Sequence, residues 1–257
     1  MTRRPALPPA RAIAAQVVSE VLHEGRSLTA ALEQALAALA PSARGDAGLI
    51  QEMTYGTLRW AIALQAQLQV FLKKPLKQKD QDIHALLLVG LYQLTHMQVA
   101  PHAAVTETVS AASALGKDWA KNLVNAVLRN FLRMPPAERA QLISAPHLAH
   151  SHPPWLLQQL RDAWPEDWPA ICAANNERPP MTLRVNLQKT TRADYLATLA
   201  SSGMPATIVA HTEAGLTLAK PVAVTHLPGF PTGLVSVQDG AAQLAAVLLD
   251  AQPGERI

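Results

Sequence analysis

The most apolar part of the chain is Ile83–Met134. Within it, Leu86–Leu94 carries leucine or valine at most positions and leaves no polar face, which predicts a helix buried on nearly all sides. Pro101 interrupts this helix, and further helices are expected to begin near Ala103 and near Asp118. We therefore expect one central helix wrapped by amphipathic ones.

Apolar residues at helical spacing continue towards the N-terminus. They predict helices at Ala12–His23 and Leu28–Leu39, and one long amphipathic run from Asp46 to Phe71. Ser27 and Asp46 stand where N-caps are needed. No segment up to residue 135 alternates as a strand would, so we predict a bundle of about six or seven helices.

The pattern changes after Pro136, where short helices, alternating segments and turn residues follow one another. This mixture is typical of a small α/β module. Helices are expected at Glu138–Ile143, Pro154–Ala163, Pro165–Asn175, Arg192–Ser202 and Ala241–Asp250. Strands are expected at Thr182–Asn186, Thr207–His211, Leu216–Ala219 and within Leu234–Asp239, with a turn near Gly215 and a further strand beginning at Ile257.

Composition and charge narrow the classes of function. Hydrophobic residues make up 49% of the 257 residues and charged residues 16%, which suits folded cores rather than disorder. No apolar run reaches the roughly 18 residues that span a bilayer, and no signal peptide is recognisable. We expect a cytoplasmic protein with no membrane partner. Residues 1–135 hold 14 Lys and Arg against 9 Asp and Glu, which favours either ordinary solvated helix faces or a phosphate-binding surface.

No complete catalytic constellation is present in the sequence. The single cysteine, Cys172, lies in an apolar run and is interpreted as a buried, inert thiol. His147, His150 and His152 are close together, but no cysteine or obvious carboxylate ligand accompanies them. We therefore expect no metal site and no catalytic residue within this chain.

Nine short segments, in a fixed order, carry a family resemblance. They are AxxVxxxVLxxGxSL (Ala14–Leu28), QEMTYGTLRW (Gln51–Trp60), VGLYQL (Val89–Leu94), PHAAVTETV (Pro101–Val109), KNLVNAVLRNF (Lys121–Phe131), HPPWLL (His152–Leu157), ANNERPPMTLRVN (Ala174–Asn186), LPGF (Leu227–Phe230) and VSVQDGAAQ (Val235–Gln243). No single segment is decisive, but this set in this order resembles the ribosomal RNA small-subunit methyltransferase B family, whose N-terminal domain is NusB-like.

The resemblance implies a mainly α chain with four parts. These are a loose N-terminal arm (residues 1–10), a NusB-like all-α RNA-binding domain (11–140), a small α/β linker or RNA-recognition module (141–234) and the truncated start of a Rossmann-like methyltransferase domain (235–257). It also implies an enzyme that transfers a methyl group from S-adenosylmethionine to C5 of a cytosine in 16S rRNA, through a cysteine adduct. The family's cofactor loop and catalytic cysteines would follow Ile257, so we expect this chain alone to be an inactive N-terminal fragment that does not bind the cofactor tightly.

The expected partner is 16S rRNA or a small-subunit assembly intermediate, bound by a monomer. On the helical domain the expected RNA-binding surface is basic and comprises Arg11, Arg44, Lys73, Lys74, Lys77, Lys79, Lys117, Lys121, Arg129 and Arg133. Alternation places Arg184 and Asn186 on one strand face, opposite Leu183 and Val185, where they either bind RNA or bridge two modules.

Gln238 and Asp239 follow the last predicted strand. The resemblance places them beside the cleft for the cofactor and the target base, whereas Asp239 would equally suit a helix N-cap with no ligand role. The alternative functions are a non-enzymatic NusB-like RNA-binding or antitermination module and a helical scaffold for proteins. A stand-alone NusB-like module would end near residues 135–145, so the further residues favour the enzyme.

Overall fold

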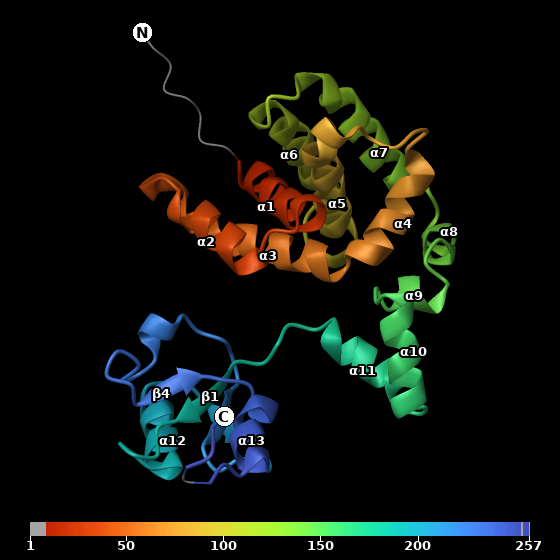
Figure 1. The fold of residues 1–257 in the computed structure, drawn as a ribbon. Helices are drawn as coiled ribbons and strands as arrows, with labels where there is room; N and C mark the ends of the chain where they lie inside the picture. Colours follow the sequence, from red (N-terminus) through yellow and green to blue (C-terminus); the bar gives the residue numbers. More distant parts are fainter. Residues whose placement is uncertain (1–8, 253, 257) are drawn as a thin grey trace. The chain divides into compact units, whose positions relative to one another are not determined.

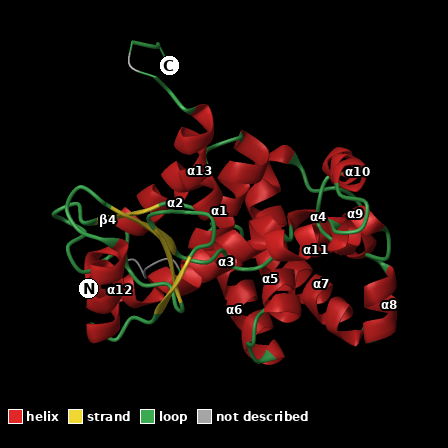
Figure 2. Cartoon of the chain, turned by 90° about the horizontal axis from the view of Figure 1, so that it is seen from below, coloured by secondary structure: helices red, strands yellow, loops and turns green. Residues whose placement is uncertain are grey.

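The chain divides into two compact units between Asn176 and Glu177. The computed structural model describes residues 9–252 and 254–256. Figure 1 follows the chain by colour from the helical first unit to the mixed second unit, and Figure 2 separates helices from strands. Among the described residues no helix is both long and apolar enough to cross a membrane.

The first unit begins with a helical bundle. Its α-helices up to residue 133 are α1 (Ala10–Glu24), α2 (Leu28–Ala37), α3 (Ala47–Arg59), α4 (Ala61–Phe71), α5 (Gln81–His96), α6 (Pro101–Ala114) and α7 (Lys121–Arg133). Short 3-10 turns precede three of them: η1 (Pro41–Asp46), η2 (Gln78–Asp80) and η3 (Asp118–Ala120). The described part of this stretch contains no strand, as the hydrophobic pattern predicted.

Helix α5 is the centre of the bundle, which confirms the prediction made from Leu86–Leu94. Residues 85–93 are all buried, and α5 contacts α1, α3, α4, α6 and α7. Figure 1 shows α5 surrounded by these helices. Burial on every side is why the segment has no polar stripe: solvent reaches none of its faces.

The predicted long helix from Asp46 to Phe71 is wrong, because the structure breaks it at Trp60. Trp60 leaves the helical region (φ −98°, ψ 12°), and its ring packs edge-on against His96 of α5 at 4.4 Å between centroids. Both segments are helical by pattern, so the break was invisible to periodicity. Ser27 and Asp46 occupy the predicted N-cap positions of α2 and α3, but neither accepts a capping hydrogen bond through its side chain.

Four shorter helices complete the first unit: α8 (Pro136–Gln141), α9 (Pro146–Ala149), α10 (Pro154–Ala163) and α11 (Trp168–Asn175). Helix α9 contacts α4, and the backbone N–H of Ala63 donates to Ser151 Oγ at 3.4 Å. Helices α10 and α11 bury a small core of their own around Leu157, Leu160 and Cys172.

The second unit is built on an antiparallel sheet in the order β2-β3-β1-β4. The strands are β1 (Thr182–Val185), β2 (Ala206–Ile208), β3 (Gly215–Leu218) and β4 (Val235–Val237), with α12 (Arg192–Ser201) after β1, η4 (Val224–His226) before β4 and α13 (Gly240–Leu249) after it. The boundary predicted at 234/235 falls inside this sheet, because β4 pairs with β1 in the register Arg184↔Ser236.

The alternation of residues along β1 determines which face of the sheet packs against the core. Leu183 and Val185 are 0% and 1% exposed and pack with Tyr195 and Leu199 of α12. Arg184 points to the other side, as predicted, where α13 lies beside it. The sheet therefore has one core face and one face that is free to carry polar chemistry.

The hairpin between β2 and β3 differs from the prediction. Gly215 is the first residue of β3 rather than the turn, which is made by residues 209–214 with His211 at φ 62°. A Cβ on Gly215 would lie 2.2 Å from Thr212 Oγ1, so close approach of the turn requires glycine there. The strand predicted to begin at Ile257 lies outside the described residues.

Candidate nucleic-acid interface and polar pocket

Four of the predicted lysines stand on the loop between α4 and α5. Lys73, Lys74, Lys77 and Lys79 are all exposed, around Pro75, which keeps this segment out of a helix. The loop follows the end of α4, where Phe71 packs edge-on against Phe131 of α7. We call residues 72–79 the basic loop. Its exposed ammonium groups are free to bind phosphates by charge alone.

Lys117 belongs to the structure of the bundle rather than to its free surface. Its Nζ lies 2.8 Å from Asp80 Oδ1 and 3.4 Å from Asp82 Oδ1, and it donates to the backbone oxygen of Lys79 at 2.6 Å. The hydrogen bond to Asp80 raises the pKa of Lys117, and the nearby Asp82 adds to this. Lys117 therefore fixes the end of the basic loop and neutralises the two carboxylates beside it.

The predicted basic face of α7 divides in the same way. Arg129 and Arg133 are exposed, although Arg129 Nε also donates to Asn125 Oδ1 at 2.8 Å. Lys121 pairs with Asp118 at 2.7 Å, and this contact lowers the pKa of Asp118. Exposed pairs of this kind break at little cost, so Lys121 remains available to a phosphate.

The two remaining arginines of the predicted surface differ in exposure. Arg44 is exposed on η1. Arg11 is mostly buried: its Nε donates to Gln93 Oε1 at 2.8 Å and its guanidinium lies 4.0 Å from Glu107. Burial lowers the pKa of Arg11, with opposing contributions from Glu107 and Asp46. Arg11 ties α1 to the centre of the bundle.

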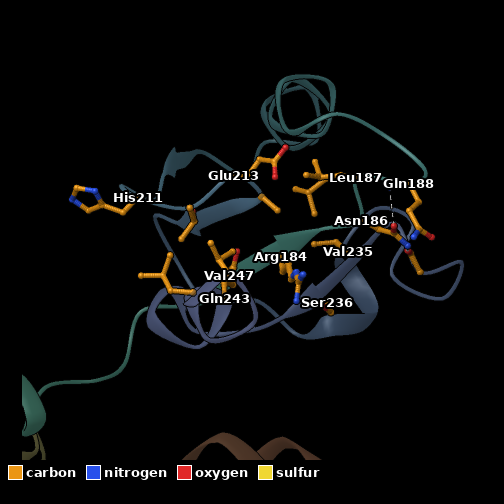
Figure 3. A pocket seen from close by; sticks show the side chains of 15 residues that line it. Arg184, Asn186, Leu187, Gln188, His211, Glu213, Val235, Ser236, Gln243 and Val247 are labelled. Atoms are coloured by element: carbon orange, nitrogen blue, oxygen red, sulfur yellow. Dashed lines mark hydrogen bonds between the residues drawn. The ribbon is translucent and has the colours of Figure 1, made fainter. Parts of the chain in front are cut away.

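The second unit holds a pocket of about 690 Å³ beside its sheet, which we call the polar pocket because Arg184, Asn186 and Gln243 line it. It is lined by Arg184, Val185, Asn186, Leu187, Gln188, His211, Thr212, Glu213, Ala214, Gly233, Val235, Ser236, Gln243, Leu244 and Val247. Figure 3 shows Asn186 and Gln188 at one end of the pocket and His211 at the other, with Arg184 and Ser236 between them. The predicted pair Arg184 and Asn186 thus lines one cavity.

Hydrogen bonds link three of the predicted residues to the walls of this polar pocket. Arg184 donates to Gln238 Oε1 at 3.2 Å, which joins two residues that the sequence placed in separate sites. Asn186 Nδ2 donates to the backbone oxygen of Gly233 at 2.9 Å, and its Oδ1 accepts from the backbone N–H of Gln188. Asn186 thus shapes the pocket wall through contacts within the second unit, and neither contact joins it to another module.

Gln243 is a site residue that sequence reasoning missed. Its Nε2 donates to the backbone oxygens of Leu183 and Gln238, at 3.3 and 3.1 Å. Its Oε1 is buried and has no hydrogen-bond partner among the described residues. A buried acceptor without a donor is costly, so this atom of a pocket-lining residue has a free energy cost that a donor would relieve. Its position in VSVQDGAAQ was the only signal that the sequence offered.

Asp239 acts as the N-cap of α13, the role that was weighed against ligand binding. Its Oδ2 accepts from the backbone N–H groups of Ala241 at 2.8 Å and Ala242 at 3.3 Å. Of the predicted pair Gln238 and Asp239, only Gln238 is connected to the polar pocket, because it accepts a hydrogen bond from Arg184.

The histidine group and the cysteine have packing roles in the first unit. The ring of His150 packs edge-on against Trp168, and His152 Nδ1 lies 2.5 Å from the backbone oxygen of His150. Cys172 is 0% exposed, and burial raises the pKa of its thiol, so it is protonated and sheltered at neutral pH.

The described residues do not fit S-adenosylmethionine. A Rossmann-type site needs parallel strands that end at a common edge and a glycine-rich turn from a strand into a helix. The sheet of the second unit is antiparallel in all its pairings, and the β4–α13 turn of the described chain offers only Gly240. No chemical step of this chain is therefore assigned to the cofactor.

Two family profiles match successive parts of the chain. The NusB family profile matches residues 8–133, and the profile of the RsmF/B-like methyltransferase ferredoxin-like domain matches residues 152–225. A crystal structure titled PH0851 superposes with a TM-score of 0.69 over 98% of this chain and 58% of that one, and its 15% identity makes this a likeness of fold alone. The fold and profiles define a class: a NusB-like helical domain followed by a methyltransferase-type ferredoxin-like domain.

Curated relatives give the family within that class. Ribosomal RNA small subunit methyltransferase B of Pseudomonas syringae is 49% identical over 82% of this chain and 47% of its own length. The proteins of that name from Pseudomonas putida and Vibrio cholerae are 46% and 45% identical over 96% of this chain and 56% of theirs. The chain belongs to the ribosomal RNA small subunit methyltransferase B family and spans about half the length of these relatives.

This result bears on the alternatives. The second profile and the relatives extend well past the NusB-like domain, and neither a stand-alone antitermination module nor a helical scaffold accounts for that extension. The predicted family, the mainly α fold class and the NusB-like domain are confirmed.

Proposed function

We propose that this chain is the RNA-recognition portion of a 16S rRNA (cytosine-C5)-methyltransferase. The observation that carries the proposal is the 45–49% identity to proteins named ribosomal RNA small subunit methyltransferase B, across both units of the chain. The partner is 16S rRNA or a small-subunit assembly intermediate, met by a monomer in the cytoplasm.

For the parent enzyme the proposal includes methyl transfer from S-adenosylmethionine to C5 of a cytosine, through a cysteine adduct at C6. Nucleophilic attack of that kind needs an accessible thiolate. Cys172 supplies neither accessibility nor a lowered pKa, so the reacting cysteine is not in this chain. The chain alone is therefore expected to be inactive and to bind the cofactor weakly at most.

In this proposal the first unit supplies the electrostatic part of RNA binding. The cations proposed to do this are the exposed Lys73, Lys74, Lys77, Lys79, Arg129 and Arg133 and the partly exposed Lys121. Contacts of ammonium and guanidinium groups to phosphates hold an RNA in place without reading its sequence. Lys117 contributes indirectly, by holding Asp80 and Asp82 in ion pairs at the end of the basic loop.

The polar pocket supplies the selective part. Arg184 offers a forked donor, and Gln243 Oε1 offers an acceptor that still needs a donor. A ribose hydroxyl or a base amino group provides such a donor, whereas a phosphate does not. Gln238 holds the Arg184 guanidinium at this site, and Asp239 fixes the start of α13, which carries Gln243.

RNA binding is tested with a labelled fragment of small-subunit rRNA and fluorescence anisotropy at several salt concentrations. We expect measurable affinity that falls steeply as salt rises. In Arg184→Gln the affinity should fall roughly tenfold, because a charge-assisted contact is lost. Lys220→Gln serves as the control, because Lys220 is an exposed cation of the same unit outside the pocket. Affinity that is insensitive to both salt and Arg184→Gln would contradict the proposal.

Methyl transfer is tested with radiolabelled S-adenosylmethionine and the same rRNA. The 257-residue chain should leave the RNA unlabelled, and a full-length relative should label it in parallel. Label in the RNA incubated with the chain alone would show that these 257 residues hold a complete active site, contrary to the proposal.

A further inference from the structure

A second pocket, of about 410 Å³, lies within the NusB-like domain and is separate from the polar pocket of the second unit. It is formed by the end of α1, the last two turns of α4, the basic loop and the start of α5. Its lining residues are His23, Gln65, Gln69, Leu72, Pro75, Leu76, Gln81 and His84. Its volume falls within the range of about 300–1,000 Å³ that small-ligand pockets occupy.

The basic loop forms one wall of this pocket. Leu72, Pro75 and Leu76 line the cavity, and the two leucines also pack against the core of the bundle. Lys73 and Lys74 sit between these residues and are exposed. Adjacent Cα atoms are 3.8 Å apart, so the lysine cations lie within side-chain reach of whatever occupies the cavity. One loop thus combines an apolar wall with a cationic rim.

Helices α4 and α5 add hydrogen-bonding groups to the lining of the pocket. Gln65 and Gln69 are one helical turn apart on α4, so their amides lie on the same side of the helix. Gln81 adds a third amide at the start of α5. Each amide offers both donors and an acceptor, and none of the lining residues is a carboxylate. The nearest acidic residues on α5 and η2, Asp80 and Asp82, are already paired with Lys117.

His84 lines the pocket and carries a ring nitrogen that the protein leaves unsatisfied. Its Nδ1 is buried without a hydrogen-bond partner among the described residues, and its ring packs edge-on against His23 at 5.3 Å. Burial, and then the neighbouring His23, lowers the pKa of His84 to about 4, so the ring is neutral at physiological pH. A neutral imidazole can accept or donate at an uncharged ligand edge.

We propose that this pocket takes an unpaired nucleobase of the RNA, with the flanking phosphates held by Lys73, Lys74 and Lys77. The apolar wall suits the face of a base, and the amides with His84 suit its hydrogen-bonding edge. Exposed bases of single-stranded loops are the usual targets of sequence-selective RNA recognition. The assignment rests on the proposed RNA-binding function and adds a base-specific site to the electrostatic surface.

The test compares two short labelled RNAs of the same length, one single-stranded and one fully paired. Two variants remove hydrogen-bonding groups from the pocket and leave its volume and charge nearly unchanged: His84→Leu and the double variant Gln65→Leu/Gln69→Leu. Gln51→Leu is the matched control, because Gln51 is an exposed glutamine of α3 outside the pocket. The double variant stands in for His84→Leu should the latter fail to fold.

We expect both pocket variants to bind the single-stranded RNA roughly tenfold more weakly, from the loss of one to two hydrogen bonds. Their salt dependence should match the wild type, because no cation is removed. Binding of the paired RNA should not change. In the wild type, NMR signals of the His84 imidazole should shift when the single-stranded RNA is added, a response that a purely structural histidine would not give.

Three other outcomes would contradict the assignment, each in a different way. If the pocket variants bind like wild type while the charge reversals Lys73→Glu and Lys74→Glu weaken binding, the nucleobase site is wrong and the RNA-binding function stands. If neither set of variants changes binding, the basic loop is not an RNA surface and the nucleobase site is wrong, while the RNA-binding function is decided by the salt and Arg184→Gln titrations. Equal loss for single-stranded and paired RNA would also overturn the assignment of a base pocket.

Discussion

At the scale of single residues, His84 predicts a pH dependence of stability. Its pKa is about 4 in the folded state against an ordinary 6.5, so the folded state binds fewer protons between these values. The stability that depends on a neutral His84 is fully present above pH 6.5 and is lost as the pH falls towards 4. We expect a loss of about 1–2 kcal/mol after allowance for partial solvent screening.

His84→Leu is the variant that isolates this contribution. It removes the titrating ring and the unsatisfied Nδ1, so the variant should be at least as stable as wild type near neutral pH and clearly more stable in mild acid. Urea unfolding of both proteins near neutral pH and in mild acid measures the difference in stability. Comparing the two proteins cancels the effects of the other histidines, which both contain. The same fall in stability with pH in both proteins would show that His84 does not cause it.

The residue scale also shows where sequence reasoning ends. Alternation correctly turned Arg184 away from Leu183 and Val185, because a strand fixes which side each residue faces. The pairing of Lys117 with Asp80, and the contact of His84 with His23, join positions far apart in the chain. No local pattern encodes such contacts. The sequence could therefore predict a surface of ten basic residues, but not which of them pair with other residues of the bundle.

At the scale of elements, the close contact of α3 with α5 predicts that one added methyl group will lower the stability of the protein. Gly56 of α3 faces Tyr92 of α5, and a Cβ on Gly56 would lie 1.9 Å from Tyr92 Cζ. Gly56→Ala must displace that ring, whose hydroxyl donates to Glu52 at 2.8 Å. We expect a loss of about 1–3 kcal/mol of unfolding free energy, the usual cost of overpacking a core.

The same helix provides the control for that prediction. Gly48 is also within α3, and a Cβ there meets no atom within 4 Å. Gly48→Ala should therefore leave stability unchanged or raise it by up to about 1 kcal/mol, through helix propensity. Chemical unfolding followed by circular dichroism compares the two variants. Similar behaviour of both would mean that the close approach of α3 and α5 does not exist in solution.

The elements themselves were largely predictable, because a helix or strand is a local pattern of burial. Helix α10 was predicted with its bounds, Pro154–Ala163, from Pro154 at the first helical position. The break at Trp60 and the pairing of β4 with β1 were not predicted. Both depend on tertiary partners, His96 of α5 in one case and a strand about fifty positions earlier in the other.

At the scale of the whole molecule, the chain has two units with separate cores, and the proposed function gives each a different part in RNA binding. The first carries exposed cations on a helical bundle, and the second carries the polar pocket beside its sheet. The sequence could indicate the first through its uneven charge. It could not indicate the unsatisfied atoms of Gln243 and His84, because burial without a partner becomes visible only when the elements are packed. Family resemblance, rather than local chemistry, supplied the link to methyl transfer.

The basic loop gives the prediction that tests this division at the scale of the molecule. Reversing Lys73, Lys74 and Lys77 to glutamate should weaken binding of most RNA sequences alike, since phosphates carry no sequence information. Affinity for single-stranded RNA falls as salt rises. Removing three phosphate contacts should make the slope of log affinity against log salt shallower by about 2. Anisotropy titrations at several salt concentrations measure this slope. Lys74→Glu and Lys220→Glu are matched single charge reversals at exposed lysines. Only Lys74→Glu should change the slope. An unchanged slope in the triple variant, or an equal change in both single variants, would mean that attraction comes from the net charge of the chain and not from this loop.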